Sequence, residues 1–225
     1  VIYAQCVKSN KQTTNEIDKI SVADSKELAG CNLRITDGAG KEIISWTSGN
    51  RDSVKASVTS EDGYRNLKYY FDENGNLHVG GLFHDKEYTL TETKPADGYV
   101  TAEAIAYMLK QKVAEDGTVT SVVNIKQKDG TYLEQEDDKT VMKDGQTHIQ
   151  LLKLDKKTGQ ALGGAKFVVM DSQGNEVMKF VTKDDVYDIT GKLVVGETYT
   201  FKETSAPSGY RLAKPVKVTI KDTGD

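Results

Sequence analysis

Two glutamates lie within segments whose alternation is typical of half-buried strands. In YTLTET, Glu92 has the same parity as Tyr88 and Leu90, so it is expected to point with them toward a core. YTFKET repeats this arrangement around Glu203. An ionised carboxylate in a core is costly, so each glutamate should hold a proton or contact a strong partner there. The alternative is a glutamate near a strand end that reaches solvent or a backbone amide.

Two lysines have the matching inward parity. Lys19 shares a face with Ile17 in NEIDKI, and Lys153 shares one with Leu151 in HIQLLKLD. A single inward lysine usually extends its ammonium group to the surface. Both lysines, however, precede the leucine of an LxG motif by nine residues (28 − 19 and 162 − 153), which makes two independent strand-end lysines a poor explanation. The sequence thus predicts an amine and a carboxyl group that face the same core, twice.

The elements that must position these residues also occur twice. The segment KISVADSKELAGCNLRITDGAGKEI from Lys19 aligns without a gap on KLDKKTGQALGGAKFVVMDSQGNEV from Lys153, an offset of 153 − 19 = 134. The glutamates align at an offset of 203 − 92 = 111, so the first copy holds 134 − 111 = 23 extra residues. They fall in or near NRDSVKASVTSEDGYRNLKYYFDENG, which predicts an enlarged loop or an added hairpin near residues 50–75.

Short alternating runs separated by Gly, Asn and Asp turns dominate the chain, and helical patterns are weak. This pattern predicts an all-β fold of antiparallel sandwiches. The segment TAEAIAYMLKQKVAEDG is expected to form a strand–turn–strand, because PVKVTIKDTGD occupies the matching place in the second copy. We expect one domain over 15–146, a second over 147–225, and a lead-in strand or the tail of a preceding domain over 1–14.

The combined motif K-x8-LxGAxFxxxDxxG and YTFxETxAPxGY is similar to that of the Cna protein B-type domain, also called SpaA-type or prealbumin-like, of Gram-positive pilins and adhesins. The resemblance covers nearly all of 147–225 and most of 15–146. It departs at Cys31, where the family tends to have Ala, and in the insertion. It implies two tandem immunoglobulin-like (prealbumin-like) antiparallel β-sandwiches.

The resemblance also implies an intramolecular isopeptide bond between a lysine of the first strand and an Asn or Asp of the last strand, assisted by the glutamate. It assigns the amine to Lys19, the assisting acid to Glu92, and the acceptor to Asp144 of KTVMKDGQT, with Asn124 as the alternative acceptor. Burial favours a neutral amine and a protonated glutamate, and folding holds the reacting groups in contact. Since the reaction happens once per domain, the chain is expected to be no enzyme with turnover and to need no cofactor.

The second copy carries the matching Lys153 and Glu203, but no last-strand acceptor is visible before Asp225. We expect this copy to lack its last strand here, with the acceptor beyond Asp225 and Lys153 unlinked within these residues. An edge left open in this way invites the addition of another strand.

Composition and motifs exclude several other classes of function. The net charge of −4, with both signs interspersed, gives no basic stripe for nucleic acid. No apolar run approaches the roughly 18 residues that span a bilayer, and no hydrolase or phosphate-loop motif occurs. His78 and His84 match no metal-ligand spacing, so they are expected in exposed loops and no metal site is predicted. Cys6 and Cys31 are expected to be free thiols, with a bridge between them as the alternative.

The resemblance therefore implies a structural subunit or stalk of a Gram-positive cell-surface pilus or adhesin, extracellular and attached to the cell wall. Its expected partners are neighbouring domains or pilin subunits. The alternative is a ligand-binding adhesin module that contacts a host surface molecule through the first-domain insertion. Deleting the insertion separates the two, because only the adhesin module would lose its ligand.

Overall fold

The computed structural model describes residues 14–222, which divide into two compact units. The first unit comprises residues 14–96 and 101–144, and the second comprises 97–100 and 145–222. All of the named elements in this part of the chain are strands, so the prediction of an all-β fold is confirmed. No helix within the described residues is long and apolar enough to cross a membrane.

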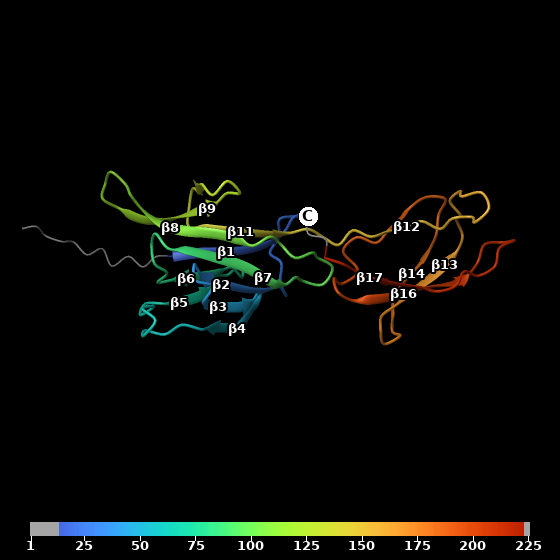
Figure 1. The fold of residues 1–225 in the computed structure, drawn as a ribbon, viewed down its shortest axis with the longest axis horizontal. Coiled ribbons are helices and arrows are strands. Elements are labelled where there is room, and N and C mark those ends of the chain that lie inside the picture. Colours follow the sequence, from blue (N-terminus) through green and yellow to red (C-terminus); the bar gives the residue numbers. More distant parts are fainter. Residues whose placement is uncertain (1–13, 223–225) are drawn as a thin grey trace, which may run out of the picture. The chain divides into compact units, whose positions relative to one another are not determined.

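The first unit contains two sheets (Figure 1). One has the strand order β11-β1-β6-β5, and the other has the order β10-β9-β8-β7-β2-β3-β4. The strands are β1 (Thr14–Ser21), β2 (Asn32–Asp37), β3 (Glu42–Thr47), β4 (Asn50–Ala56), β5 (Lys68–Phe71), β6 (Leu77–Gly80), β7 (Glu87–Lys94), β8 (Ile105–Val113), β9 (Val119–Lys126), β10 (Tyr132–Glu134) and β11 (Lys139–Asp144). The hairpin of β8 and β9 confirms the predicted strand–turn–strand.

Along the central strands, every second side chain points into the interior of the first unit. Burial alternates from Asn15 to Ser21 in β1 and from Tyr88 to Glu92 in β7. Lys19 and Glu92 are therefore buried because they share the parity of core residues. The inward apolar residues of both sheets include Ile17, Leu33, Ile35, Ile44, Leu77, Val79, Leu90, Tyr107, Leu109, Val123 and Met142.

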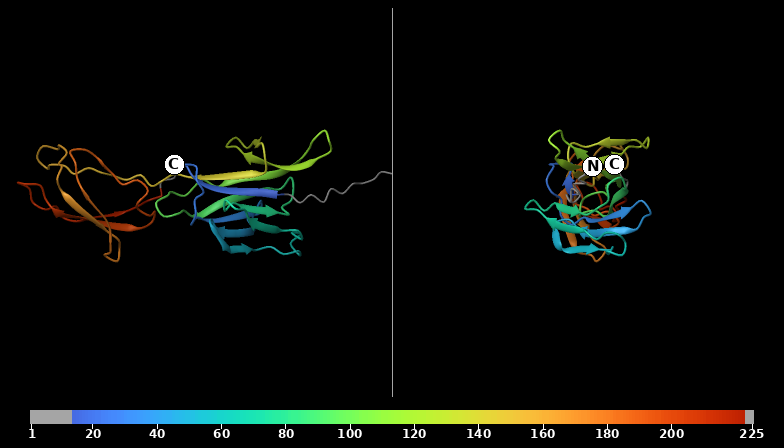
Figure 2. Two further views of the ribbon diagram at one scale, coloured as in Figure 1. Left: turned by 180° about the vertical axis from the view of Figure 1, so that it is seen from behind. Right: turned by 90° about the vertical axis from the view of Figure 1, so that its left-hand side faces the viewer.

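The first and last strands of this unit lie side by side and pair in parallel (Figure 1 and Figure 2). Lys19 is opposite Met142 in this ladder, and Ser21 is opposite Asp144. The other pairings between named strands in the described residues are antiparallel. A parallel pair needs a crossover connection, and here the chain crosses from β10 in the seven-stranded sheet to β11 in the other.

The first unit is enlarged between β3 and β6. There β4 adds an edge strand to one sheet and β5 adds an edge strand to the other, and residues 57–67 join them. The second unit has only residues 182–186 between its strands β14 (Glu176–Val181) and β15 (Tyr187–Asp188). Since β15 pairs with β12 as β6 pairs with β1, the 23 extra residues correspond to the two added edge strands and their connection.

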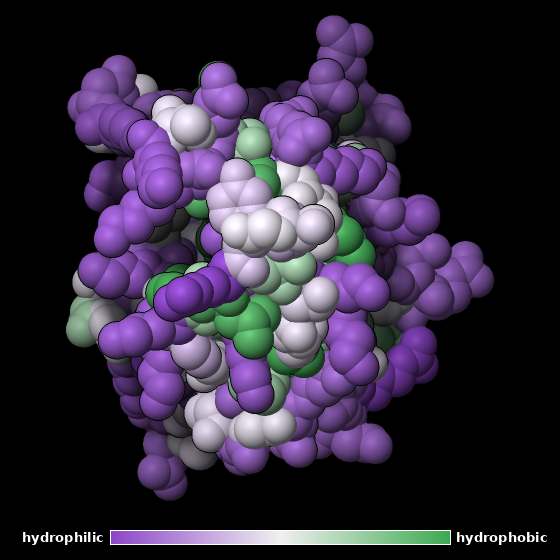
Figure 3. All heavy atoms as spheres, turned by 90° about the vertical axis from the view of Figure 1, so that its right-hand side faces the viewer, coloured by the Kyte–Doolittle hydropathy of each residue, from purple (hydrophilic) through white to green (hydrophobic). Residues whose placement is uncertain are grey.

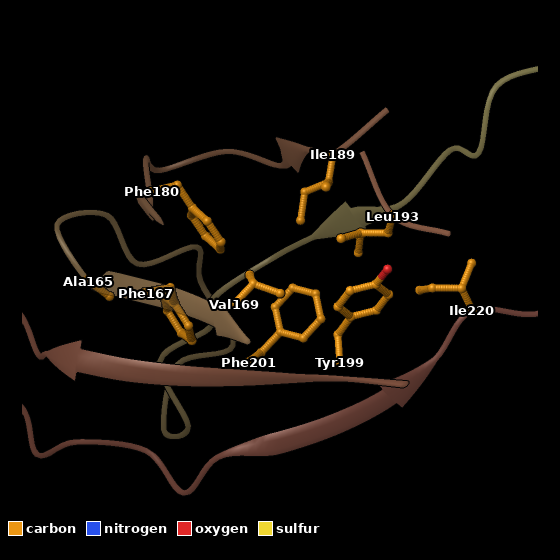
Figure 4. Close-up of a cluster of buried hydrophobic side chains, with 9 residues drawn as sticks. All are labelled: Ala165, Phe167, Val169, Phe180, Ile189, Leu193, Tyr199, Phe201 and Ile220. Atoms are coloured by element: carbon orange, nitrogen blue, oxygen red, sulfur yellow. The ribbon is translucent and has the colours of Figure 1, made fainter. Parts of the chain in front are cut away.

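The second unit is built on a sheet of order β14-β13-β16-β17 and a two-stranded sheet of β12 and β15. Its remaining strands are β12 (Gln150–Leu151), β13 (Lys166–Met170), β16 (Thr198–Ser205) and β17 (Val216–Thr219). The side chains that form its core converge from these strands and the loops between them (Figure 4). They are Ala165, Phe167, Val169, Phe180, Ile189, Leu193, Tyr199, Phe201 and Ile220.

Strand β12 has a free edge among the described residues. It pairs with β15 only, whereas β1 pairs with both β6 and β11. Leu152 and Leu154, which directly follow β12, are exposed. The edge of β12 thus offers unpaired backbone groups next to exposed apolar side chains. Apolar residues also gather within a hydrophilic surround on the face of the molecule that Figure 3 shows.

Candidate functional site

The two units hold their lysines with the same backbone contact. The N–H of Leu28 donates to the carbonyl oxygen of Lys19 at 2.7 Å, and the N–H of Leu162 donates to that of Lys153 at 2.8 Å. The offset is 134 for both partners (153 − 19 and 162 − 28), as in the sequence alignment. Each lysine backbone is therefore fixed by the loop that leads to the LxG motif.

The glutamates are oriented by a second repeated contact. The N–H of Ala102 donates to Glu92 Oε2 at 2.8 Å, and the N–H of Ala213 donates to Glu203 Oε2 at 2.6 Å. Both partners are again related by one offset, 111 (203 − 92 and 213 − 102). One carboxylate oxygen of each glutamate is thus held by the backbone, which leaves the other oxygen, Oε1, for a different partner.

In the first unit, Lys19, Glu92 and Asp144 meet in the core. Lys19 Nζ donates a hydrogen bond to Asp144 Oδ1 and lies 3.0 Å from Glu92 Oε1. The side chains of Lys19, Glu92 and Asp144 are 2%, 0% and 0% exposed. An amine and two carboxyl groups are therefore in contact and shielded from water, an arrangement that can support nucleophilic attack and proton transfer.

The environment of this site changes the pKa of Asp144. Burial raises the pKa of the Asp144 carboxyl to about 6, with a further upward contribution from Glu92 and opposition from Lys19. Two carboxyl groups face one lysine here, so the lysine cannot fully compensate two negative charges. A carboxyl group that holds a proton can lose its oxygen as water, whereas a carboxylate is a poor acyl donor.

Cys31 also belongs to this site, although its position there is not predicted by the sequence. Its Sγ lies 3.6 Å from Asp144 Oδ2, and burial raises the pKa of the thiol to about 12. Cys31 therefore remains a thiol and acts as a weak donor to the oxygen that Lys19 does not contact. The only signal in the sequence was the cysteine itself, where the second copy has Ala165. Cys6 lies outside the described residues.

Asn124, the alternative acceptor, occupies a different place. It lies on β9 and is buried, and its Nδ2 has no hydrogen-bond partner in the part of the chain that the structure describes. Within residues 14–222, no hydrogen bond joins Asn124 to Lys19. The structure therefore brings Asp144, and not Asn124, into contact with the lysine amine.

The second unit presents half of the same arrangement. Glu203 is buried, and its Oε1 has no hydrogen-bond partner among the described residues. Lys153 is half-buried and makes no ion pair in that part of the chain. Asp225, beyond which the acceptor was expected, lies outside the described residues. Glu203 is thus buried like Glu92 of the first unit, whereas Lys153 is only half-buried.

Metal ligands are also present at the first-unit site. One ligand atom each of Cys31, Glu92 and Asp144 lies within 4.8 Å of the others. Lys19 Nζ contacts both carboxyl groups, so the amine already occupies the position between them. This group is therefore better described as a lysine–carboxylate site than as a metal centre.

The expectation that His78 and His84 are exposed loop residues is wrong. His78 lies within β6, and its side chain is 15% exposed. His84 is half-buried and forms an isolated bridge with Leu109, and burial lowers the pKa of its imidazole. Tyr70 on the added strand β5 stacks on His78, and His84 lies 3.4 Å from Ser121 on β9, contacts that local sequence patterns do not reveal.

A family model described as the SpaA prealbumin-like fold domain matches residues 13–129 and 147–225 of this chain. None of the curated proteins matches the chain. Similar solved structures include a C-terminal fragment of the pilus adhesin SpaC from Lactobacillus rhamnosus GG, 17% identical, covering 95% of this chain and 83% of that one, with a TM-score of 0.44. The shaft pilin SpaA of the same organism is 16% identical over 95% of each chain, with a TM-score of 0.34. The Bacillus anthracis TIE protein is 20% identical with a TM-score of 0.38, and the match covers 95% of this chain but only 32% of that one.

Proposed function

Because this chain belongs to the family of SpaA prealbumin-like fold domains, we propose that it is a structural segment of a Gram-positive cell-surface pilus or adhesin. Its first unit is locked by an isopeptide bond between Lys19 and Asp144. The observation that carries this proposal is the buried contact of the Lys19 amine with the Asp144 carboxyl group, with Glu92 3.0 Å from the amine.

The proposed reaction is a condensation with loss of one water. Neutral Lys19 Nζ attacks Asp144 Cγ while protonated Glu92 gives its proton to the Asp144 carbonyl oxygen. Glu92 then takes a proton from the amine nitrogen and passes it to the departing Asp144 hydroxyl, which leaves as water. Glu92 finally recovers a proton from the carbonyl oxygen, so that an Nζ–Cγ amide remains. Atoms balance without an outside reagent, and Glu92 ends in the protonation state in which it began. The site turns over once, which makes the chain a self-crosslinking structural protein and no enzyme in the usual sense.

The crosslink suits a protein that bears load outside the cell. It joins the first and last strands of the unit and closes a loop of 125 residues. The role we propose is mechanical and positional: a stalk of stable units attached to the cell wall, whose partners are neighbouring domains or further pilin subunits. The free edge of β12 supports such an arrangement, because it accepts a strand from a neighbouring segment.

The intact 225-residue chain is expected to weigh about 18 Da less than its sequence mass, the loss of one water by amide condensation. A second loss is not expected, because Lys153 meets no acceptor in the described residues of its unit. Intact-mass spectrometry measures the number of bonds, and tryptic mapping should find one branched peptide that contains Lys19 and Asp144. Linear peptides for both residues would contradict the proposal, and a branch at Asn124 would move the acceptor.

The variant Cys31→Ala is expected to form the same bond, but more slowly. The amine, the acyl group and Glu92 all remain, whereas the weak S–H donor 3.6 Å from Asp144 Oδ2 is lost. The N–H of Cys31 donates to Ser48 Oγ at 3.0 Å, and in the second unit the N–H of Ala165 donates to Thr182 Oγ1 at 3.0 Å, so alanine at this place keeps the backbone contact. Intact mass at successive times after synthesis gives the rate, and a variant that never loses water would make Cys31 essential.

A ligand-binding role for the insertion is the second candidate, and exposed aromatic residues favour it. Tyr69 and Tyr70 on the added edge strand β5 are 44% and 58% exposed. Tyrosines of this kind supply large contact areas at binding surfaces. Replacing both with serine should abolish attachment to host cells if the chain is an adhesin, and should leave attachment unchanged if it is only a stalk.

A further inference from the structure

The sheet that carries Lys19 has a second polar cluster on its opposite face. Glu16 has the opposite parity to Lys19 on β1, and it is paired with His78 on β6 and with Lys139 on β11. His78 Nε2 lies 3.3 Å from Asp72 Oδ2, at the turn between β5 and β6. Residues far apart in the sequence, 16, 72 and 78, are thus brought to one place by strand register.

The donor atoms of this cluster have the spacing of a metal site. One ligand atom each of Glu16, Asp72 and His78 lies within 4.8 Å of the others. Their side chains are 13%, 22% and 15% exposed, so they are largely shielded yet within reach of solvent. No part of this cluster belongs to the Lys19 site.

The surrounding structure orients these donors. Backbone N–H groups of Asn74 and Asn76 donate to Asp72 Oδ1 at 2.9 and 3.0 Å, which turns Oδ2 toward His78. The ring of Tyr70 stacks on the His78 imidazole with centroids 4.6 Å apart and an interplanar angle of 1°. Asp72 and His78 are held in place by these contacts, so these two side chains need little reorganisation when a metal binds.

A buried amide beside the cluster has unused hydrogen-bonding capacity. Asn76 is 5% exposed, and its Nδ2 donates to Glu16 Oε1 at 3.0 Å, which places its amide head against the cluster. Its Oδ1 has no hydrogen-bond partner in residues 14–222, and neither has the buried Oδ1 of Asp18. Buried oxygens of this kind are normally satisfied by a donor or a cation.

The cluster also carries more negative than positive charge. Three carboxyl groups, those of Glu16, Asp18 and Asp72, belong to this region, and Lys139 Nζ contacts two of them, at 2.8 Å from Glu16 and 3.9 Å from Asp18. The guanidinium of Arg51 donates to the backbone oxygen of Asp72 and not to its carboxylate. A divalent cation would supply the missing positive charge.

We propose that Glu16, Asp72 and His78, with the amide oxygen of Asn76, bind a divalent transition-metal ion of the Zn²⁺ type. One imidazole nitrogen with carboxylate and amide oxygens suits Zn²⁺ at the short bond lengths this ion prefers. Ca²⁺ is disfavoured because it takes six to eight oxygens. On binding, the metal displaces Lys139 Nζ from Glu16, and a rotation of the Asn76 amide presents its oxygen instead of its nitrogen.

Zn²⁺ titrated by calorimetry into the 225-residue chain, without a polyhistidine tag, tests this proposal. We expect one Zn²⁺ per chain, and His78→Gln should weaken binding at least tenfold because the only nitrogen ligand is lost. The matched control is His84→Gln in the same unit, and His148→Gln serves for the second unit. Both controls should bind Zn²⁺ like the wild type.

The variant Lys139→Gln gives a result of the opposite sign. It removes the cation that competes for Glu16, so Zn²⁺ should bind several-fold more tightly, an effect that a misfolded variant cannot mimic. The absence of saturable binding would overturn the proposal, as would equal affinities of wild type and His78→Gln. Displacement of Zn²⁺ by an equal concentration of Ca²⁺ would overturn the assignment of the metal class.

Discussion

A chain with Glu92→Gln is expected to fold without forming the Lys19–Asp144 bond, and its first unit should melt about 10–20 °C below that of the wild type. The side-chain oxygen of glutamine still accepts the hydrogen bond from Ala102 N–H, so the local structure is kept. The proton carrier is lost, which slows general acid–base chemistry by about 10²–10⁴. Closing a loop of 125 residues is worth about 5 kcal/mol in the chain-entropy model, and this sets the shift in melting temperature.

The matched control for this variant is Glu203→Gln in the second unit. It makes the same substitution at a glutamate with the same backbone contact, to Ala213 N–H, but away from Lys19. It should therefore leave both the mass and the melting of the first unit unchanged. Intact-mass spectrometry of both variants measures bond formation, and calorimetry measures the melting of the first unit. A Glu92→Gln chain that still loses one water would show that Glu92 is not the proton carrier.

Under force, the first unit of the wild type is expected to show no unfolding event. Tension that enters through residue 19 passes across the proposed bond to residue 144, so the 124 residues between them (144 − 19 − 1) carry no load. An uncrosslinked unit instead releases roughly 400 Å of chain when it opens, at about 3.3–3.6 Å per residue. This is the largest effect that any single change in the chain should produce.

Single-molecule stretching of the wild type and of Glu92→Gln makes the comparison. The variant should gain the long extension step that the wild type lacks, while the step from the second unit appears in both chains and serves as an internal reference. A long step from the wild-type first unit would contradict a covalent link between β1 and β11. If neither chain showed the long step, the link would form without Glu92, and the role proposed for Glu92 would be wrong.

Much of this architecture follows from local rules. The parity of Lys19 and Glu92 predicts their common burial, because a strand offers only two faces. The two offsets, 134 and 111, predict the repeated hydrogen bonds at Lys153 and Glu203, because aligned residues meet the same backbone neighbours. The hairpin of β8 and β9 follows from the turn residues between two alternating runs.

Other features depend on contacts between distant strands, which local patterns do not encode. Cys31 reaches Asp144 only because β11 lies in register beside β1 and the loop before β2 passes over that edge. His78 was expected in an exposed loop, yet it is paired with Glu16 by a ladder that spans about sixty residues of sequence. Local patterns alone do not distinguish Asp144 from a turn aspartate; it was the family resemblance that named it as the acceptor, and the structure places it on β11 in contact with Lys19.

The repeated bond between a glutamate and a backbone N–H has a consequence for the order of folding. It joins residues ten positions apart, Glu92 with Ala102 and Glu203 with Ala213, whereas Lys19 and Asp144 are 125 positions apart. In the second unit Glu203 makes this contact although Lys153 has no ion pair within residues 14–222, so the contact does not depend on an acid–lysine pair. Short-range contacts close early and distant ones close late. Docking of β11 is therefore the slow and reversible final step of folding. Amide formation then makes this step irreversible, because the linked strands can no longer separate into an open chain.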